Sequence, residues 1–370
     1  MLGRTFAFAV AVAISACTAA NPSATPTPAP TRDPGSVNVS ALLDLSGSRA
    51  PSGAAQRDAL QLWADQHAAG SPHLRLRIVD VAGSPSKTVL ELRRAAVEDR
   101  ADAIVIGVPV GYDEAFAAAV QLAQVPVLFT LPIPEPAAAG GWAFALAPTP
   151  AQLARATLDH AAARVVLRST VVVSDESVTA IPERAALVTD LARRGVTTSV
   201  LKVTASDAPP RLRTIPPLTP IVFFAGTPKT YLEAARQTTA GTSLYLSYLC
   251  DLGDLADLRE AAAQATWPGS RWIAATTSAT QARTAFVQSY TDRASPPTSL
   301  AATAYDALSL LSTAAEGGID PVKMRDRLQK AAFAGVATTY SFTMSRHAGF
   351  AVEDIAFLSY TGPRTAPVIR

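Results

Sequence analysis

The stretch ADAIVIG, from Ala101 to Gly107, decides the fold class of this chain of 370 residues. Its centre, IVI at positions 104–106, is apolar at every position rather than at alternate ones. Such a run is typical of a strand that is covered on both faces, as in a parallel sheet. A second run of this kind, VVV at positions 171–173, lies further along the chain. Parallel strands need long crossovers, usually helical, so both runs predict an α/β protein.

Short apolar or β-branched runs alternate with longer helical segments along the rest of the chain. The predicted strands are Val37–Leu43, Leu74–Val81, Ala103–Gly107, Val125–Leu131, Ser169–Ser174, Thr197–Val203, Ile221–Ala225, Ser243–Tyr248 and Trp272–Ala275. Leu60, Trp63 and His67 recur at the spacing of one helix face. The predicted late helices are Gln281–Arg293, Ser299–Ala315 and Asp320–Ala332. The Pro-rich stretch Ala208–Pro220 is expected to form a loop in place of a helix.

The composition excludes several classes of protein. The chain is 49% hydrophobic and 17% charged, whereas disorder needs low hydrophobicity and high net charge. Its 32 Lys and Arg against 30 Asp and Glu give a net charge of +2, which argues against nucleic acid as a partner. The two cysteines, Cys17 and Cys250, are too few for a Cys₄ zinc site, and the four histidines share no ligand spacing. We therefore expect no metal and no cofactor.

The first 36 residues are predicted to lie outside the fold. Thr5–Ala16 is twelve apolar or small residues, about 18 Å as a helix against a bilayer core of about 30 Å, so residues 1–16 indicate a secretory signal peptide. ISAC at positions 14–17 resembles the lipobox of bacterial lipoprotein signals, which implies cleavage before Cys17 and a diacylglyceryl group on its thiol. Residues 17–36, rich in Pro, Thr and Ala, predict an extended tether. An ordinary signal peptide with an incidental cysteine is the alternative.

Residues 37–370 resemble the type I periplasmic binding proteins of the branched-chain amino acid binding group. The motifs that carry the resemblance, in family order, are Leu45-Ser46-Gly47 with Gly53, Ala101–Gly107, Val125–Leu128, Phe144–Thr149, Ala301–Ala307, Phe333–Val336 and Tyr340–Phe342. The resemblance implies two Rossmann-like lobes with parallel-type sheets, joined by a hinge of three crossovers. It places lobe one at residues 37–147 plus 276–336 and lobe two at residues 148–275 plus 337–370. A ligand would lie between the lobes, which would close on it by hinge motion.

The chain departs from the family at several positions that bind an amino acid. Gly111 stands where the amino acid binders have a Ser for the ligand carboxylate, and the acidic partner of the ligand ammonium has no clear match near Tyr248, although Asp251 is close. Because an unpaired buried charge is costly, a neutral or weakly polar solute is as good a candidate as a leucine-like amino acid. From the matching positions we predict ligand contacts at Ser46, Tyr112, Asp113, Thr130, Glu176, Thr179, Thr227 and Tyr248.

Four of these eight residues also have a structural interpretation. Asp113 is a suitable N-cap for the next helix, and Asp175 and Glu176 suit a solvated loop. Tyr112 and Tyr248 suit packing in the core or the hinge. Packing is also the expected role of Tyr305, Trp142, Trp267 and Trp272.

No set of residues predicts catalysis. Ser84-Pro85-Ser86-Lys87 matches the S-x-x-K motif of serine β-lactamases, but no companion S-D-N and K-T-G elements complete it. The sequence thus predicts a non-enzymatic, exported solute-binding protein, held by a lipid anchor at the outer face of the cytoplasmic membrane or in the periplasm. Its partners would be a small-molecule ligand and an ABC permease. The alternative is a lipoprotein of the same fold that senses a ligand or docks on a cell-envelope partner, without transport.

Overall fold

The computed structural model describes residues 35–137, 140–204, 206–227, 242–250, 265–274, 279–359, 361–362 and 366–369. The chain divides into two compact units, Met1–Asp33 and Pro34–Arg370, and every described residue belongs to the second. The predicted signal peptide, the lipidation at Cys17 and nearly all of the tether therefore lie outside the described residues. Within those ranges, no helix has the length and apolar character needed to span a membrane.

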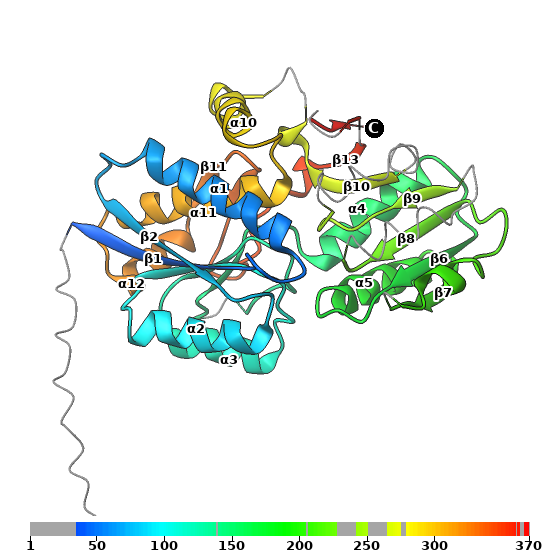
Figure 1. Cartoon of the computed structure of the whole chain (residues 1–370), viewed down its shortest axis with the longest axis horizontal. Coiled ribbons are helices and arrows are strands. Elements are labelled where there is room, and N and C mark those ends of the chain that lie inside the picture. Colours follow the sequence, from blue (N-terminus) through cyan, green and yellow to red (C-terminus); the bar gives the residue numbers. More distant parts are fainter. Residues whose placement is uncertain are drawn as a thin grey trace, which may run out of the picture. The chain divides into compact units, whose positions relative to one another are not determined.

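The first sheet is parallel, with strand order β2-β1-β3-β4-β5. Its strands are β1 (Ser36–Leu43), β2 (His73–Asp80), β3 (Ala103–Gly107), β4 (Val127–Phe129) and β5 (Ala143–Ala145), and its covering helices are α1 (Ala50–Gln66), α2 (Pro85–Val97), α3 (Glu114–Ala123) and α11 (Ser299–Ala315). Helices α1 and α11 cover one face, and α2 and α3 cover the other (Figure 1). Val105 packs on the α1 and α11 side, whereas Ile104 and Ile106 pack on the α2 and α3 side. The prediction that this run is covered on both faces is confirmed.

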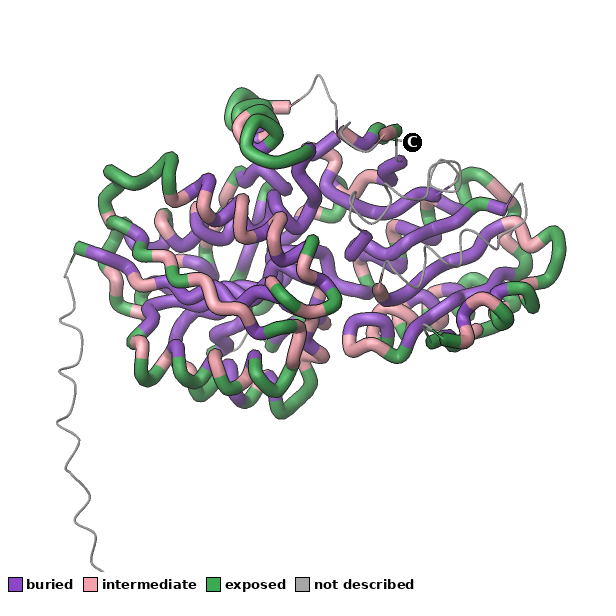
Figure 2. The backbone as a smooth tube through the Cα atoms, viewed as in Figure 1, coloured by how far each residue is buried: buried purple, intermediate pink, exposed green. Residues whose placement is uncertain are grey.

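The second sheet is mixed, with strand order β14-β13-β10-β9-β8-β6-β7. Its strands are β6 (Ser169–Ser174), β7 (Thr197–Lys202), β8 (Ile221–Ala225), β9 (Ser243–Tyr245), β10 (Ala265–Ser270), β13 (Ile355–Ser359) and β14 (Val368–Ile369). Strands β6 to β10 run parallel, and β13 pairs antiparallel with both β10 and β14. Helices α4 (Pro150–Ala162) and α5 (Ala180–Arg193) pack on it through Leu158, Leu187 and Leu191. The central strands β3 and β8 are buried at every position (Figure 2).

The remaining described elements connect or extend the two sheets. They are α6 (Ala208–Leu212), η1 (Arg271–Ile273), α10 (Gln281–Arg293), α12 (Pro321–Leu328), β11 (Ala332–Ala334), β12 (Thr339–Ser341) and η2 (Val352–Asp354). Strands β11 and β12 pair with each other, across the predicted lobe boundary at residue 336. The division of the chain into lobes stays a prediction.

The strands predicted at Val125–Leu131 and Ser243–Tyr248 are shorter in the structure, at Val127–Phe129 and Ser243–Tyr245, and three other predicted elements also differ. The strand predicted at Trp272–Ala275 is wrong for its described residues, because they belong to η1 and the residue after it. The strand lies earlier, at β10, where Pro268 is paired with Phe357 of β13. Proline has no N–H for the ladder, so it argues against a strand when only the sequence is read.

The other two differences concern helix ends. The helix predicted at Asp320–Ala332 begins after Asp320 but ends at Leu328, since Ala332 begins β11. Ala208–Pro220 is not loop throughout, because α6 forms at its start with a proline in the first turn. The N–H that proline lacks has no partner in the first turn of any helix.

Asp306 ties helix α11 to the segment between β11 and β12. Its buried carboxylate accepts hydrogen bonds from the N–H groups of Val336 (2.7 Å) and Ala337 (2.8 Å) and from the Tyr340 hydroxyl (3.1 Å). A Cβ at Gly335 would lie 2.4 Å from this carboxylate, so glycine is required there. Burial raises the pKa of Asp306 to about 7, although these hydrogen bonds act in the opposite direction.

Candidate functional site

The loop after β1 holds a buried carboxylate. Asp44 accepts hydrogen bonds from the N–H groups of Gly47 (2.6 Å) and Arg49 (3.0 Å). Gly53 approaches so closely that a Cβ there would lie 1.8 Å from the Asp44 carbonyl oxygen. The Ser-Gly loop and Gly53 therefore have a packing reason, since they let α1 begin directly beside the carboxyl end of β1.

Arg49 stands at the start of α1 and contacts the loop that follows strand β9 of the second sheet. The residue is 5% exposed, and its Nη2 donates to the Ser52 hydroxyl (2.8 Å) and to the Leu249 carbonyl (2.7 Å). Its Nε is buried and has no hydrogen-bond partner, and within the described ranges the guanidinium has no ion-pair partner within 4.0 Å. A cation is unfavourable at a helix N-terminus, so helix stability does not explain this residue.

Glu183 lies in the first turn of α5 and brings an acid to the same loop. Its Oε2 accepts hydrogen bonds from the Gly226 N–H (3.1 Å) and the Ser247 hydroxyl (3.0 Å). As a whole residue Glu183 is half-buried, but its carboxyl group is enclosed by the surrounding chain. This burial raises its pKa to about 8, and the hydrogen bonds from Ser247 and Gly226 and the charge of Arg49 lower it only in part. The carboxyl group is therefore mainly protonated at neutral pH.

A second carboxylate, Asp175, follows β6 and is held by hydroxyl and backbone donors. Its Oδ2 accepts from the N–H (2.8 Å) and the hydroxyl (2.9 Å) of Thr227, and its Oδ1 accepts from the Ser177 N–H (2.9 Å). The Ser177 hydroxyl also donates to Oδ1. Gly226 has φ +116°, and a Cβ there would lie 2.3 Å from Asp175. Asp175 thus joins the ends of β6 and β8.

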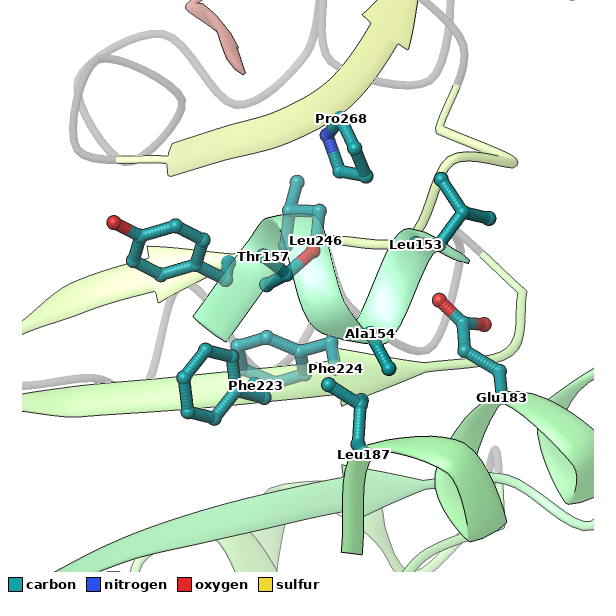
Figure 3. Close-up of a pocket in the computed structure, with 10 residues that line it drawn as sticks. Leu153, Ala154, Thr157, Glu183, Leu187, Phe223, Phe224, Leu246 and Pro268 are labelled. Carbon is teal, nitrogen blue, oxygen red and sulfur yellow. The ribbon is translucent and has the colours of Figure 1, made fainter. Parts of the chain in front are cut away.

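Two small cavities meet at Glu183. One is lined mainly by apolar side chains, and Figure 3 shows Glu183 as the one carboxylate among the residues labelled around it. The other is lined by Pro132, Pro150, Leu153, Thr179, Glu183, Ser247 and Leu249. Each has a volume of about 10 Å³, which is room for about one water molecule. In this arrangement neither cavity holds a solute of amino acid size.

The loop after β3 also approaches the loop after β6. A Cβ at Gly111 would lie 3.9 Å from the Cβ of Val178, an ordinary van der Waals contact. Together with the bond from Arg49 to Leu249, this contact brings the carboxyl ends of strands from both sheets together. That edge is where open parallel sheets bind ligands.

Two of the predicted contacts lie close to Glu183. Thr179 is buried and lines the same cavity as Glu183 and Ser247. Thr227 is half-buried and is bonded to Asp175. Their role as ligand contacts stays a prediction, as it does for the remaining six.

Three predicted contacts lie at the carboxyl edge of the first sheet. Thr130 is fully buried, and its hydroxyl donates to Gln56 (2.5 Å). Tyr112 has φ +43° and packs against Phe116 and Phe129 with ring centroids 6.2 and 5.2 Å away. Burial raises the pKa of Tyr112 to about 12. Asp113 is exposed and caps α3 by accepting from an N–H at 2.8 Å, in agreement with its structural interpretation.

The last three predicted contacts have other neighbours. The exposed Ser46 hydroxyl donates to Asp80 (2.5 Å), which lowers the pKa of Asp80 to about 2. Glu176 is exposed and pairs with two cations, Arg184 (2.7 Å) and Lys202 (3.4 Å). Tyr248 is 1% exposed and packs with apolar residues of both sheets' loops, and its hydroxyl has no regular hydrogen-bond partner.

Arg49, Glu183 and Ser247 were not among the predicted contacts. One signal was available for Arg49, because a basic residue at the start of a helix opposes the helix dipole and needs another reason. Glu183 gave no signal, since an acid in the first helical turn is favourable by itself.

The structure also shows where the S-x-x-K motif lies and whether the described residues could bind a metal. The Ser84 hydroxyl of the S-x-x-K motif caps α2 by accepting the Lys87 N–H at 3.3 Å. Among the described residues, no group of three or more His, Cys, Asp or Glu side chains could hold a metal ion.

A family model of periplasmic binding proteins matches residues 36–362. The chain therefore belongs to the periplasmic binding protein family, with the α/β fold of its type I members, and the resemblance read from the sequence is confirmed. No curated protein matches the chain.

Several solved structures share the fold. An extracellular ligand-binding receptor from Rhodopseudomonas palustris HaA2 has a TM-score of 0.76 at 15% identity, over 90% of this chain and 99% of that one. LivJ, a branched-chain amino acid transporter substrate binding protein from Streptococcus pneumoniae in complex with isoleucine, has the same four values. An ABC transporter solute binding protein from R. palustris in complex with benzoate has a TM-score of 0.74 at 17% identity, over 90% and 96%. At such identities the likeness shows the fold alone.

Proposed function

We propose that this protein is an exported, lipid-anchored solute-binding protein. It captures a small polar molecule, amino-acid-like or amide-like, between its two lobes and delivers it to an ABC permease. The observation that carries the proposal is the hydrogen bond from Arg49 to Leu249, because it brings together the carboxyl ends of strands β1 and β9 from different sheets. Polar side chains gather at that edge, where a solute would replace the contacts between the lobes.

The related structures support the proposal without fixing the solute. LivJ was solved with isoleucine and the R. palustris protein with benzoate, so the fold accepts both amphoteric and simple acidic solutes. The protonated Glu183, the Ser247 hydroxyl and the Thr179 hydroxyl supply hydrogen-bonding groups for a polar solute. Glu183 and Ser247 now bond to each other and to backbone N–H groups, and a bound solute would exchange these bonds for its own.

A second function is favoured by the small volume beside Glu183. About 10 Å³ in each cavity suits a protein whose lobes stay together and which docks on an envelope partner or senses a ligand without transport. Docking differs from capture in that no solute occupies this edge, and sensing differs from capture in that the solute is not passed to a permease. Neither function requires a reaction, and we propose that the chain has no enzymatic activity.

A thermal-shift screen of the purified full-length protein distinguishes solute binding, for capture or for sensing, from docking without a solute. The panel consists of amino acids, primary amides, urea-like solutes, simple carboxylic acids, sugars and nucleosides. A solute present at 100 times its Kd adds about 2.7 kcal/mol to the free energy of unfolding, a shift that the screen detects readily. No shift with any member of the panel would favour docking over capture.

A further inference from the structure

We infer that the buried guanidinium of Arg49 is the anion-binding group of the solute site, so that the solute carries a carboxylate. The inference rests on the proposed capture of a solute and adds the chemical class of that solute. Three observations support it. The buried guanidinium lacks a charged partner, Arg49 stands at the N-terminus of α1, and the acids nearby are bonded to other groups.

The buried guanidinium of Arg49 is the main evidence that a ligand binds at this edge. The residue is 95% buried, yet within the described ranges no carboxylate lies within ion-pair distance of it and its Nε has no hydrogen-bond partner. A buried charge is costly unless it is both paired and hydrogen-bonded. Nη2 donates to two neutral acceptors, the Ser52 hydroxyl and the Leu249 carbonyl, and neither of them bonds to Nε. A bound anion would meet the requirement that these neutral groups leave open.

The start of α1 adds a second attraction for an anion. Arg49 is the N-cap residue of this helix of 17 residues, so its backbone is placed beside the first N–H groups of the helix. Unpaired N–H groups at a helix N-terminus favour negative charge. No acidic residue lies in the first turn of α1, although the Asp44 carboxylate before the helix accepts the N–H of the N-cap residue Arg49. The positive end of the helix and the guanidinium therefore act in the same direction.

The three nearby acids do not take the place of that anion, because none of them pairs with the guanidinium. Asp44 accepts only the backbone N–H groups of Gly47 and Arg49. Asp175 is held by the N–H and hydroxyl groups of Ser177 and Thr227, which leaves its charge already solvated by neutral donors. Glu183 is enclosed and shares its Oε2 between Gly226 and Ser247, and its raised pKa keeps it mainly neutral. The positive charge of Arg49 is thus left for a solute.

A carboxylate suits this guanidinium better than a single-atom anion. It accepts from Nε and from one terminal nitrogen side by side, the fork geometry that strengthens arginine–carboxylate pairs. In the structure, the Leu249 carbonyl occupies an acceptor position at Nη2. A solute carboxylate would replace that carbonyl and in addition satisfy Nε.

The experiment compares acids with their primary amides, which have nearly the same shape but lack the negative charge of the carboxylate. The pairs are propionate and propionamide, 3-methylbutanoate and 3-methylbutanamide, benzoate and benzamide, and leucine and leucinamide. Binding to the full-length protein is measured by titration calorimetry, for wild type, Arg49→Gln and Arg57→Gln. Arg57 is the matched control, because it lies on α1 and its side chain is 40% exposed.

We expect at least one acid to bind and its amide to bind about thirtyfold more weakly or worse, because one partner of a buried charge pair is lost. Arg49→Gln should weaken the binding of that acid by a similar factor, and Arg57→Gln should leave its binding unchanged.

Equal binding of acid and amide overturns the inference but leaves solute capture intact. Unchanged binding of the acid by Arg49→Gln has the same consequence. No binding by any member of any pair overturns the inference and counts against capture as well. Since Arg49→Gln also loses the bond to Leu249, its melting temperature without solute is recorded. If this variant is unstable, the comparison of each acid with its amide on the wild-type protein still tests the inference.

Discussion

The Nη2 atom of Arg49 lies 2.7 Å from the carbonyl oxygen of Leu249, 200 residues further along the chain. Arg49 follows β1 of the first sheet, and Leu249 follows β9 of the second. A hydrogen bond to a charged group contributes about 1.5–3 kcal/mol. The bond is therefore strong enough to influence whether the two groups of loops stay together when no solute is present.

Loss of this bond should separate the loops. We expect Arg49→Gln to shift the equilibrium toward an open form by about tenfold or more, because 1.4 kcal/mol corresponds to a factor of ten. The measurement is the radius of gyration from small-angle X-ray scattering, without solute, compared with Arg57→Gln. An identical radius of gyration for wild type and both variants would show that Arg49 does not hold the loops together.

The enclosed Glu183 should make stability depend on pH. Below its ordinary pKa of 4.5 both the folded and the unfolded chain keep the proton, so its titration does not change the free energy of unfolding. Between pH 4.5 and about 8 the unfolded chain releases the proton while the folded chain retains it, so stability falls as pH rises. Glu183→Gln removes this titration. Its stability relative to wild type should therefore increase from pH 5 to pH 8, by on the order of 3 kcal/mol.

Urea unfolding at several pH values measures this difference. The control is Glu114→Gln, because Glu114 also lies in the first turn of a helix but is exposed. Asp306, whose pKa is raised to about 7, adds a pH dependence of the same sign to wild type and to both variants, so it cancels in the comparison. A difference between Glu183→Gln and wild type that stays constant with pH would contradict the enclosed position of this carboxyl group.

Asp306 should be among the residues whose loss costs most stability. Asp306→Ala leaves the N–H groups of Val336 and Ala337 without their acceptor, and the Tyr340 hydroxyl as well. We expect a loss of about 3 kcal/mol or more in the free energy of unfolding, since each unsatisfied buried donor costs about 1–3 kcal/mol. Asp292→Ala is the control, because Asp292 is exposed and accepts a hydrogen bond from the exposed side chain of Gln288. Equal losses in the two variants would refute this role.

Two glycines should respond very differently to the same change. Gly53→Ala places a Cβ 1.8 Å from a backbone oxygen, so the loop after β1 must move, and we expect a loss of more than about 3 kcal/mol. Gly111→Ala meets its nearest atom at 3.9 Å and should change stability by less than about 0.5 kcal/mol. Thermal unfolding of both variants is the measurement. Tolerance of alanine at position 53 would mean that the loop has another conformation.

The proposed anchor has its own test. Cys17→Ala should move the protein from the membrane fraction to the soluble fraction of the producing cell, because the thiol would carry the lipid. The comparison is made by cell fractionation and immunoblotting, with Cys250→Ala as the control, since Cys250 is a buried cysteine inside the fold. Retention of Cys17→Ala in the membrane fraction would leave an ordinary signal peptide or another mode of attachment.

The sequence predicted those elements whose pattern depends on local chemistry. The strands at Ala103–Gly107 and Ser169–Ser174 and the helices at Gln281–Arg293 and Ser299–Ala315 have the predicted bounds. Strand β10 was missed because its proline opposes a strand, and its main pairing is with β13, far along the chain. Pairing at such a distance leaves no trace in a local pattern.

The candidate site was harder to predict for the same reason. The acid of Glu183 is enclosed by Gly226 and Ser247, which are 43 and 64 residues away in sequence. Thr130 is predicted as a ligand contact from its position after a strand, and its hydroxyl donates to Gln56 of α1, 74 residues away in sequence. Residue type and spacing give the edge of the sheet at which a side chain lies. The direction in which it points depends on packing between distant segments.

Native mass spectrometry of the full-length protein, incubated with the pooled panel of solutes, tests the central claim most directly. The account predicts a mass increase of one small molecule for each chain, reduced in Arg49→Gln and retained in Arg57→Gln. A chain that keeps its bare mass in the presence of every solute would contradict solute capture at the edge where Arg49 meets Leu249.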